Sequence, residues 1–151
     1  MRVVIQRVST ASVTIEGKVK SAILNGLLVL VGFESSDTDE DIDWTCKKII
    51  QLRIFDDPNG VMNLSVKEIY GEILVVSQFT LHAKTKKGNR PSYIQAAPPE
   101  ISVPLYNLFV KILSENLGSE VQTGEFGAHM MVGLVNDGPV TIIIDSKNKE
   151  F

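Results

Sequence analysis

Three β-type segments follow one another in the first 33 residues, and this succession limits the fold more than any other feature. Residues 3–15 are rich in Val, Ile and Thr, and residues 19–24 continue the pattern after the turn-forming Glu16-Gly17-Lys18. Asn25-Gly26, a strong turn signal, then precedes the apolar run 27–33. Because such short turns join neighbouring strands that run in opposite directions, the chain is predicted to open with an antiparallel sheet.

A first helix is predicted after this sheet. Asp37 can cap its start, with Glu40 three positions later, and an acidic first turn suits the positive end of the helix dipole. Trp44 lies off the predicted apolar stripe and is interpreted as a boundary packing residue. The stripe itself is predicted to carry Ile42, Cys46, Ile49 and Arg53.

A second helix is predicted to follow Pro98-Pro99 and to stop at Gly118. One face of this helix is predicted to hold Ile101, Leu105, Leu108 and Ile112. The remaining strands are predicted at residues 73–81, 121–126, 130–135 and 140–145. The predicted fold class is therefore α+β, a mostly antiparallel sheet with two helices in a single domain over residues 1–151.

Composition excludes several classes of protein. The 44% hydrophobic content can supply a real core, and Cys46, the only cysteine, cannot form an internal disulfide and is interpreted as an inert core residue. Two histidines and one cysteine make no recognisable zinc motif, so we expect no metal and no cofactor. The apolar runs are too short to span a bilayer, and no signal peptide is recognisable, so the predicted location is the cytoplasm.

The charge is uneven along the chain. A formal net charge of −3 argues against a general nucleic-acid binder, and acidic residues gather over residues 34–43. A basic loop nevertheless follows, with Lys84, Lys86, Lys87 and Arg90. A solvated charged loop is the simpler interpretation, but such a patch on an acidic protein can also contact phosphates.

The strand predicted at residues 73–81 is a candidate site. Strand alternation places Gln78, Thr80 and His82 on one face, at the end of a segment that is apolar on both faces. Polar groups that leave a buried strand are costly unless they are satisfied, which favours a site; the alternative is a hydrogen-bonded Thr80 beside a solvent-facing His82. Ser77 and His82 face opposite sides, so they form no hydrolase dyad, and the G-x-S-x-G motif is absent.

A second candidate lies at Asn136-Asp137-Gly138-Pro139. Local sequence favours an ordinary hairpin turn, because Asn-Asp-Gly is turn chemistry and proline cannot sit in the middle of a ladder. The alternative is a Gly-cis-Pro pair that aims two carbonyl groups rigidly at a ligand. His129, which lies between two predicted strands, is interpreted as structural.

Together these segments resemble a known family. Ser77-Gln78-Phe79-Thr80-Leu81 and the segment from Asn136 to Thr141, NDGPVT, resemble the paired signatures of the D-aminoacyl-tRNA deacylases, formerly called D-tyrosyl-tRNA deacylases. The opening MRVVIQRV, the segment KGNRPSY and the segment AAPPE are similar to that family as well. The resemblance runs almost from end to end in the same order. His82 and Lys84 depart from it, because the family often has other residues there.

The resemblance implies a compact β-barrel-like fold with flanking helices, active as a homodimer with its sites at the subunit interface. The Gly138-Pro139 peptide would be cis and would reach into the active site of the partner subunit, with Asn136 in the same motif and Arg7 helping to hold it. Its carbonyl groups would orient the α-amino group so that an L side chain is rejected by main chain alone. Glycine would not be rejected, which implies activity on glycyl-tRNA mischarged on tRNA-Ala.

The resemblance also implies the chemistry. The enzyme would hydrolyse the ester between a D-amino acid and the 3′ end of tRNA, with Ser77, Gln78, Phe79 and Thr80 at the catalytic centre. Backbone N–H groups near Phe79 and Thr80 could form an oxyanion hole. Thr80 would be the nucleophile, or water would attack with help from the 2′-hydroxyl of the terminal adenosine. The second account is favoured slightly, because His82 is the only general base near Thr80 on its strand.

Three further alternatives remain open from the sequence. A related editing enzyme would carry a trans Gly-Pro peptide and relaxed chirality. A non-catalytic tRNA-binding module, or a purely structural dimerisation domain, would not need both motifs.

Overall fold

A computed structural model describes residues 1–150, so the last residue of the domain predicted over residues 1–151 lies outside the described residues. The central strand is β1 (Arg2–Ile15). It pairs antiparallel with β2 (Lys18–Ile23), β3 (Gly26–Gly32) and β8 (Met131–Asp145). The predicted antiparallel start is therefore confirmed.

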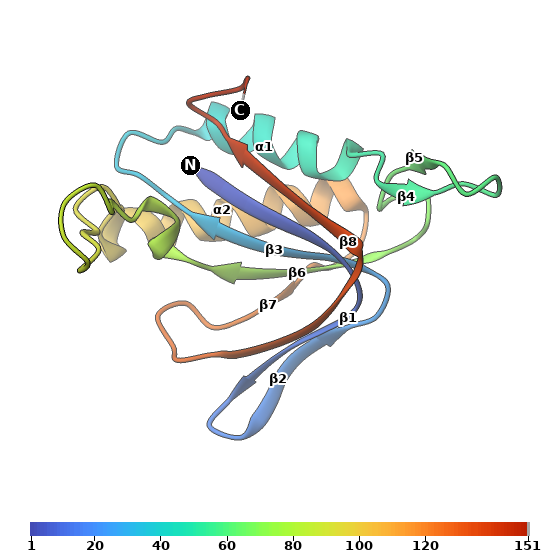
Figure 1. Cartoon of the computed structure of the whole chain (residues 1–151), viewed down its shortest axis with the longest axis horizontal. Helices are drawn as coiled ribbons and strands as arrows, with labels where there is room; N and C mark the ends of the chain where they lie inside the picture. The colour runs from blue at the N-terminus through green and yellow to red at the C-terminus, as the bar shows by residue number, and fades with distance from the viewer. Residues whose placement is uncertain (151) are drawn as a thin grey trace.

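The other side of β3 carries a parallel extension. β6 (Glu72–Ser77) runs parallel to β3, and the short β7 (Gln122–Thr123) runs parallel to β6. Figure 1 shows the sheet curling strongly, with β2 and β7 on the same side of the curl. Ser21 Oγ on β2 donates a hydrogen bond of 2.8 Å to the carbonyl of Thr123 on β7. The sheet is therefore mixed and nearly closed, which confirms the barrel-like α+β fold but adds parallel pairs that the sequence pattern did not predict.

The helix α1 (Asp39–Gln51) follows β3 and packs with α2 (Pro99–Leu117) on one face of the sheet (Figure 1). Thr38, not Asp37, caps α1: Thr38 Oγ1 accepts from the backbone N–H of Asp41, and the Asp41 carboxylate accepts from the backbone N–H of Thr38. The predicted Asp37–Glu40 cap is wrong by one residue, because Asp37 is buried and bonded elsewhere. Arg53 lies beyond the helix and is exposed, so it is not part of the buried stripe.

The buried face of α2 differs from the prediction by about one position. Its centre is Ser102, Tyr106, Phe109, Leu113 and Leu117, whereas Ile101 is exposed and the other three predicted residues are half-buried. The helix is apolar over a broad face, so periodicity predicts a wide stripe and only packing selects its centre. Gly118 ends the helix as predicted, with φ of +85°.

Apolar side chains fill two regions, one on each face of the sheet. The helix side contains Val29, Val75 and Phe109, and the barrel side contains Val13, Leu28 and Leu74. β3 and β6 are therefore covered on both faces, as their continuous apolar runs predict. Cys46 is fully buried, and burial together with the charge of Asp43 raises the pKa of its thiol to about 12, which agrees with an inert core residue.

The predicted hairpin at residues 136–141 is wrong. β8 is one continuous strand, and both of its halves pair with β1: Ile142 lies opposite Ile5, and Met131 lies opposite Thr14. The register shifts between Gln6 and Thr10, and this irregular stretch of β1 accommodates Pro139, which has no N–H to donate to the ladder. The strand predicted at residues 121–126 shortens to β7.

Two short strands, β4 (Phe55–Asp56) and β5 (Met62–Leu64), form a separate antiparallel pair after α1. Within residues 1–150, neither helix is long and apolar enough to cross a membrane. The same residues contain no cluster of three or more His, Cys, Asp or Glu side chains that could hold a metal ion.

Candidate active site

The strand predicted to continue to residue 81 ends at Ser77. The backbone N–H of Gln78 still donates to the carbonyl of Val31 over 2.7 Å, and residues Phe79–His82 then form a single 3-10 turn, η1. Gly32 ends β3 beside this turn; a Cβ atom there would lie 2.6 Å from the carbonyl oxygen of Gln78. The two-residue alternation therefore stops at Ser77, and Gln78, Thr80 and His82 do not share a strand face.

The start of η1 presents unpaired amides. The backbone N–H groups of Phe79 and Thr80 have no hydrogen-bond partner among residues 1–150, as the first N–H groups of a helical turn lack an internal acceptor. The Gln78 side-chain amide donates to the hydroxyl of Thr80. Phe79 is 56% exposed, and its ring packs edge-on against Tyr93 with 5.0 Å between ring centroids.

A cavity of about 260 Å³ opens at this end of β6. One wall consists of Ser77, Gln78 and Phe79, and the opposite wall comes from the loop between β7 and β8, including His129 and Met130. His129, interpreted from the sequence as structural, is exposed and lines this cavity. Nothing in its local sequence indicated this position; the loop is brought there by the pairing of β7 with β6.

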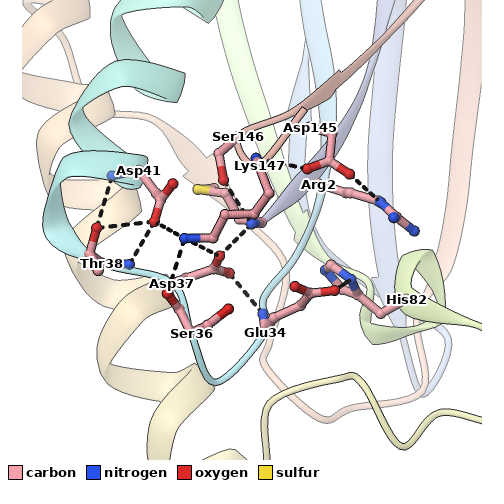
Figure 2. Close-up of polar contacts among 11 residues, drawn as sticks. Arg2, Glu34, Ser36, Asp37, Thr38, Asp41, His82, Asp145, Ser146 and Lys147 are labelled. Carbon is pink, nitrogen blue, oxygen red and sulfur yellow. Dashed lines mark hydrogen bonds and ion pairs between the residues drawn. The ribbon is translucent and has the colours of Figure 1, made fainter. Parts of the chain in front are cut away.

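His82 contacts Glu34 and makes no hydrogen bond to Thr80. Its side chain is 1% exposed, and Nδ1 lies 2.9 Å from Oε1 of Glu34 (Figure 2). The solvent-facing His82 considered from the sequence is therefore wrong. The position also removes His82 as a general base for Thr80, whose hydroxyl is held by Gln78 instead.

Arg7 holds the main chain before Gly138. It is buried on β1, and its Nε donates to the carbonyl of Asp137 over 3.0 Å. Its Nη1 donates to the carbonyl of Ile54 over 2.6 Å, and carboxylates of Asp56 and Asp137 lie at 3.6 and 3.3 Å. The guanidinium thus ties β8 to the segment that enters β4.

Asn136 bridges the Gly138-Pro139 peptide. Its side-chain oxygen accepts from the backbone N–H of Val140 over 3.0 Å, and its side-chain amide donates to the Val140 carbonyl over 3.1 Å. The Gly138-Pro139 peptide is cis, as the resemblance implied and unlike the alternative editing branch. Gly138 has φ of +136°, a conformation that L side chains rarely adopt.

One chain does not bring the two motifs together. Ser77 is level with Val31 and Val3, whereas Gly138 is level with Arg7. At about 3.3 Å per residue and about 4.8 Å per strand, these positions differ by roughly 13 Å along the sheet and roughly 14 Å across it. Residues 7 and 136–139 do not line the cavity.

The predicted basic loop, between Lys84 and Ser92, lies beside the cavity. Lys84 and Ser92 form an isolated antiparallel bridge that closes it, and Tyr93, the next residue, contacts Phe79. The four basic residues of the loop are exposed, and none of them forms an ion pair within residues 1–150: Lys84, Lys86, Lys87 and Arg90.

The chain is similar to a described family over nearly its whole length. The model of the family D-Tyr-tRNA(Tyr) deacylase matches residues 4–145. The chain belongs to this deacylase family. A Bacteroides fragilis protein named D-aminoacyl-tRNA deacylase is 71% identical over 150 residues, covering 99% of this chain and 100% of that protein. A Flavobacterium psychrophilum protein of the same name is 69% identical over the same coverage.

Two solved structures share the fold of this chain. One, titled "c-Myc DNA Unwinding Element Binding Protein", has a TM-score of 0.92 and 41% identity, and covers 96% of this chain and 98% of that one. Another, titled as a probable eukaryotic D-amino acid tRNA deacylase, has a TM-score of 0.82 and 20% identity over 95% of this chain and 97% of that one. At that identity the second likeness supports the fold alone.

Proposed function

We propose that this protein hydrolyses the ester bond of D-aminoacyl-tRNA and releases free tRNA and the D-amino acid. The observation that carries the proposal is that Ser77, Gln78 and Phe79 of the family motif line a cavity. At the same turn, the N–H groups of Phe79 and Thr80 have no hydrogen-bond partner among residues 1–150. The curated relatives carry the name D-aminoacyl-tRNA deacylase at up to 71% identity over their full length. The proposed location of the protein is the cytoplasm, where charged tRNA is used.

In the proposed chemistry, backbone N–H groups stabilise an oxyanion, and no side chain has to act as a nucleophile or a base. The N–H groups of Phe79 and Thr80 donate to the tetrahedral oxyanion, and such a donor is typically worth about 3 kcal/mol. Gln78 holds the Thr80 hydroxyl, and His82 contacts Glu34, so no base from η1 activates Thr80. Water therefore attacks the ester, assisted by the 2′-hydroxyl of the terminal adenosine.

Chirality is read across a homodimer in this proposal. Gly138 and Pro139 are exposed and lie far from the cavity of their own chain, so they are free to enter the cavity of a second copy. Their carbonyl groups orient the substrate amino group, and a D side chain then points outward. Glycine is accepted as well, because it has no side chain for this element to reject. Exposed apolar side chains flank this element on β8 and suit an interface: Met131, Leu134, Val135 and Ile143.

The basic loop is the proposed contact for tRNA phosphates. Lys84, Lys86, Lys87 and Arg90 are exposed and free of ion pairs within the described residues, so no internal partner competes with phosphate. The loop closes next to Tyr93 and Phe79, which places it beside the cavity that receives the 3′ end.

The test is a side-by-side incubation with D-Tyr-tRNA, L-Tyr-tRNA and Gly-tRNA, followed by measurement of the remaining charged tRNA. We expect rapid release from D-Tyr-tRNA, release from Gly-tRNA and almost none from L-Tyr-tRNA. Binding of all three without release would instead support a non-catalytic tRNA-binding module. Comparable release from the D and L substrates would support an editing enzyme with relaxed chirality.

A further inference from the structure

We propose that Arg2 and the pair Glu34–His82 are positioning residues that hold η1 at two points and so set the positions of the Phe79 and Thr80 amides. This inference rests on the proposed function of η1 as the catalytic turn. None of the three side chains lines the cavity, so each would act through the turn and not on the substrate.

The first point of attachment is the carbonyl group of Leu81. Arg2 Nη1 donates to it over 3.1 Å, and Arg2 Nε donates to Oδ2 of Asp145 over 2.7 Å. Burial alone would raise the pKa of Asp145, but hydrogen bonds from Arg2 and from the Lys147 backbone lower it, so the carboxylate stays charged and holds the guanidinium. The end of η1 is thereby tied to the paired ends of β1 and β8.

The second point is the imidazole of His82. Its Nδ1 lies 2.9 Å from Oε1 of Glu34, yet neither ring nitrogen has a hydrogen-bond partner with good geometry in residues 1–150. The ring is buried, and its Cδ2 lies beside Gly32, 3.1 Å from where a Cβ atom on that residue would stand. An apolar side chain would suit this environment better if packing were the only demand. The contact with the Glu34 carboxylate is what distinguishes this imidazole from an apolar packing residue.

Glu34 is itself held in place. Its backbone N–H donates to Oδ2 of Asp37 over 2.7 Å, and Oδ1 of Asp37 accepts from the amine of Met1 over 2.5 Å. Figure 2 shows these groups as one polar network that runs from the start of α1 and the end of β8 to His82. The main chain that carries Glu34 is thus anchored to the main body of the sheet.

The attachment at residues 81–82 reaches the reacting amides because η1 is a single short turn. The N–H of Leu81 donates to the Gln78 carbonyl, and that of Ala83 to the Thr80 carbonyl, so a shift at one end moves the other. The Gln78 carbonyl rests against Gly32, which leaves no room for the turn to settle closer to β3. Misplacement of an oxyanion donor by about 1 Å can cost as much as a hundredfold in rate.

The test compares His82→Gln, Glu34→Gln, the double variant and Arg2→Lys with the wild-type protein on D-Tyr-tRNA. The control is Asp43→Asn, which removes a carboxylate from an exposed ion pair with Lys47 (2.6 Å) that does not contact η1. We expect each single variant to lower kcat by about tenfold or more with little change in KM. The double variant should lose no more than the worse single variant, and the control should match wild type.

The double variant separates positioning from folding. Two side chains that act through one contact lower kcat only once, whereas two independent losses of stability add. An unchanged kcat in His82→Gln and Glu34→Gln, or an additive double variant, would overturn the inference even if the melting temperature falls. Glu34 is 23% exposed at its side chain, so Glu34→Gln remains informative if His82→Gln does not fold.

Gln78→Ala, measured in parallel, distinguishes this inference from the proposed site. If Gln78→Ala lowers kcat and the His82 and Glu34 variants do not, the inference fails while the site stands. If no variant of η1 or its supports changes kcat, both the inference and the assignment of η1 as the catalytic turn fail.

Discussion

Thr80 has a hydroxyl group that accepts from the Gln78 amide and has no base from η1 beside it. Thr80→Ala should therefore lower kcat by less than roughly a hundredfold. Removal of a true nucleophile would instead lower kcat by several orders of magnitude. A substrate with 2′-deoxyadenosine at its 3′ end should react more slowly with the wild-type protein than the normal substrate does with Thr80→Ala. Single-turnover release of D-tyrosine measures both effects.

The control for this comparison is Thr80→Ser, which keeps a hydroxyl group for Gln78 to bind. A Thr80→Ala protein with an unchanged melting temperature and no measurable activity, next to an active Thr80→Ser, would establish Thr80 as the nucleophile and contradict the proposed mechanism.

Gly138 is a residue whose identity the backbone demands. With φ of +136°, an added Cβ would lie 2.8 Å from Cγ2 of Val140 and 2.9 Å from its backbone nitrogen. Gly138→Ala should therefore displace the carbonyl groups proposed to read chirality, lowering the D-over-L ratio of kcat/KM as well as the rate. Gly17→Ala, at φ of +77° with open space around it, is the control for glycine strain elsewhere. An unchanged D-over-L ratio in Gly138→Ala would exclude this element from chiral selection.

At the scale of elements, the basic loop between Lys84 and Ser92 has a role that salt dependence can test. Replacing Lys86 and Lys87 together by Ala should weaken tRNA binding and reduce the slope of log K against log salt by about one to two units. The matched control is Lys18→Ala with Lys20→Ala, two exposed lysines on β2. Equal slopes for the two double variants would mean that the loop is a solvated surface feature and does not contact phosphates.

The end of β8 and the start of α1 are joined by Lys147, whose Nζ lies 2.5 Å from Oδ2 of Asp41. Burial raises the pKa of Asp41, but hydrogen bonds from Lys147, Thr38 and Ser146 outweigh it, and the net pKa lies well below the usual range. A lowered folded-state pKa contributes stability above about pH 4 that is lost as pH falls through the folded-state value.

Lys147→Met should therefore reduce the free energy of unfolding near pH 7, by about 0.5–1 kcal/mol for a partly exposed pair. The difference from wild type should shrink as pH falls below about 4, because the carboxylate is then increasingly protonated. Urea unfolding at several pH values measures this difference in the free energy of unfolding. Lys149→Met, which removes a cation 4.8 Å from the Trp44 ring, should show no such pH dependence. A loss that persists undiminished at pH 2 would contradict the assignment to Asp41.

At the scale of the whole molecule, the two motifs lie too far apart in one chain to act on one ester, so activity should depend on dimer formation. Val135 on β8 is 58% exposed beside the Gly138 element, and Val135→Asp should shift the protein to monomer and lower activity in parallel. Val61→Asp is the matched control, because Val61 is also 58% exposed but lies between β4 and β5. Sedimentation measures the oligomeric state, and a deacylation assay measures the activity. A fully active monomer would rule out an active site shared between two subunits.

The order of the first three strands, the two helices and the two motifs followed from the sequence alone, because each depends on neighbouring residues. Turn residues such as Asn25-Gly26, the periodicity of α1 and α2 and the Gly118 stop are all local signals. The continuous apolar runs of β3 and β6 likewise predicted their burial on both faces. The family resemblance then named the residues of the candidate site.

Only the tertiary structure decided how those pieces meet. β6 ends at Ser77 because the turn after it packs against Gly32, and His82 is buried because Glu34 lies there; neither partner is near in sequence. β8 stays one strand because β1 pairs with both of its halves, although its local residues are those of a turn. Thr38 replaces Asp37 as the cap because Asp37 binds the amine of Met1. Contacts between distant segments override local preference wherever their energy exceeds it, and in this protein that happens mainly around the candidate site.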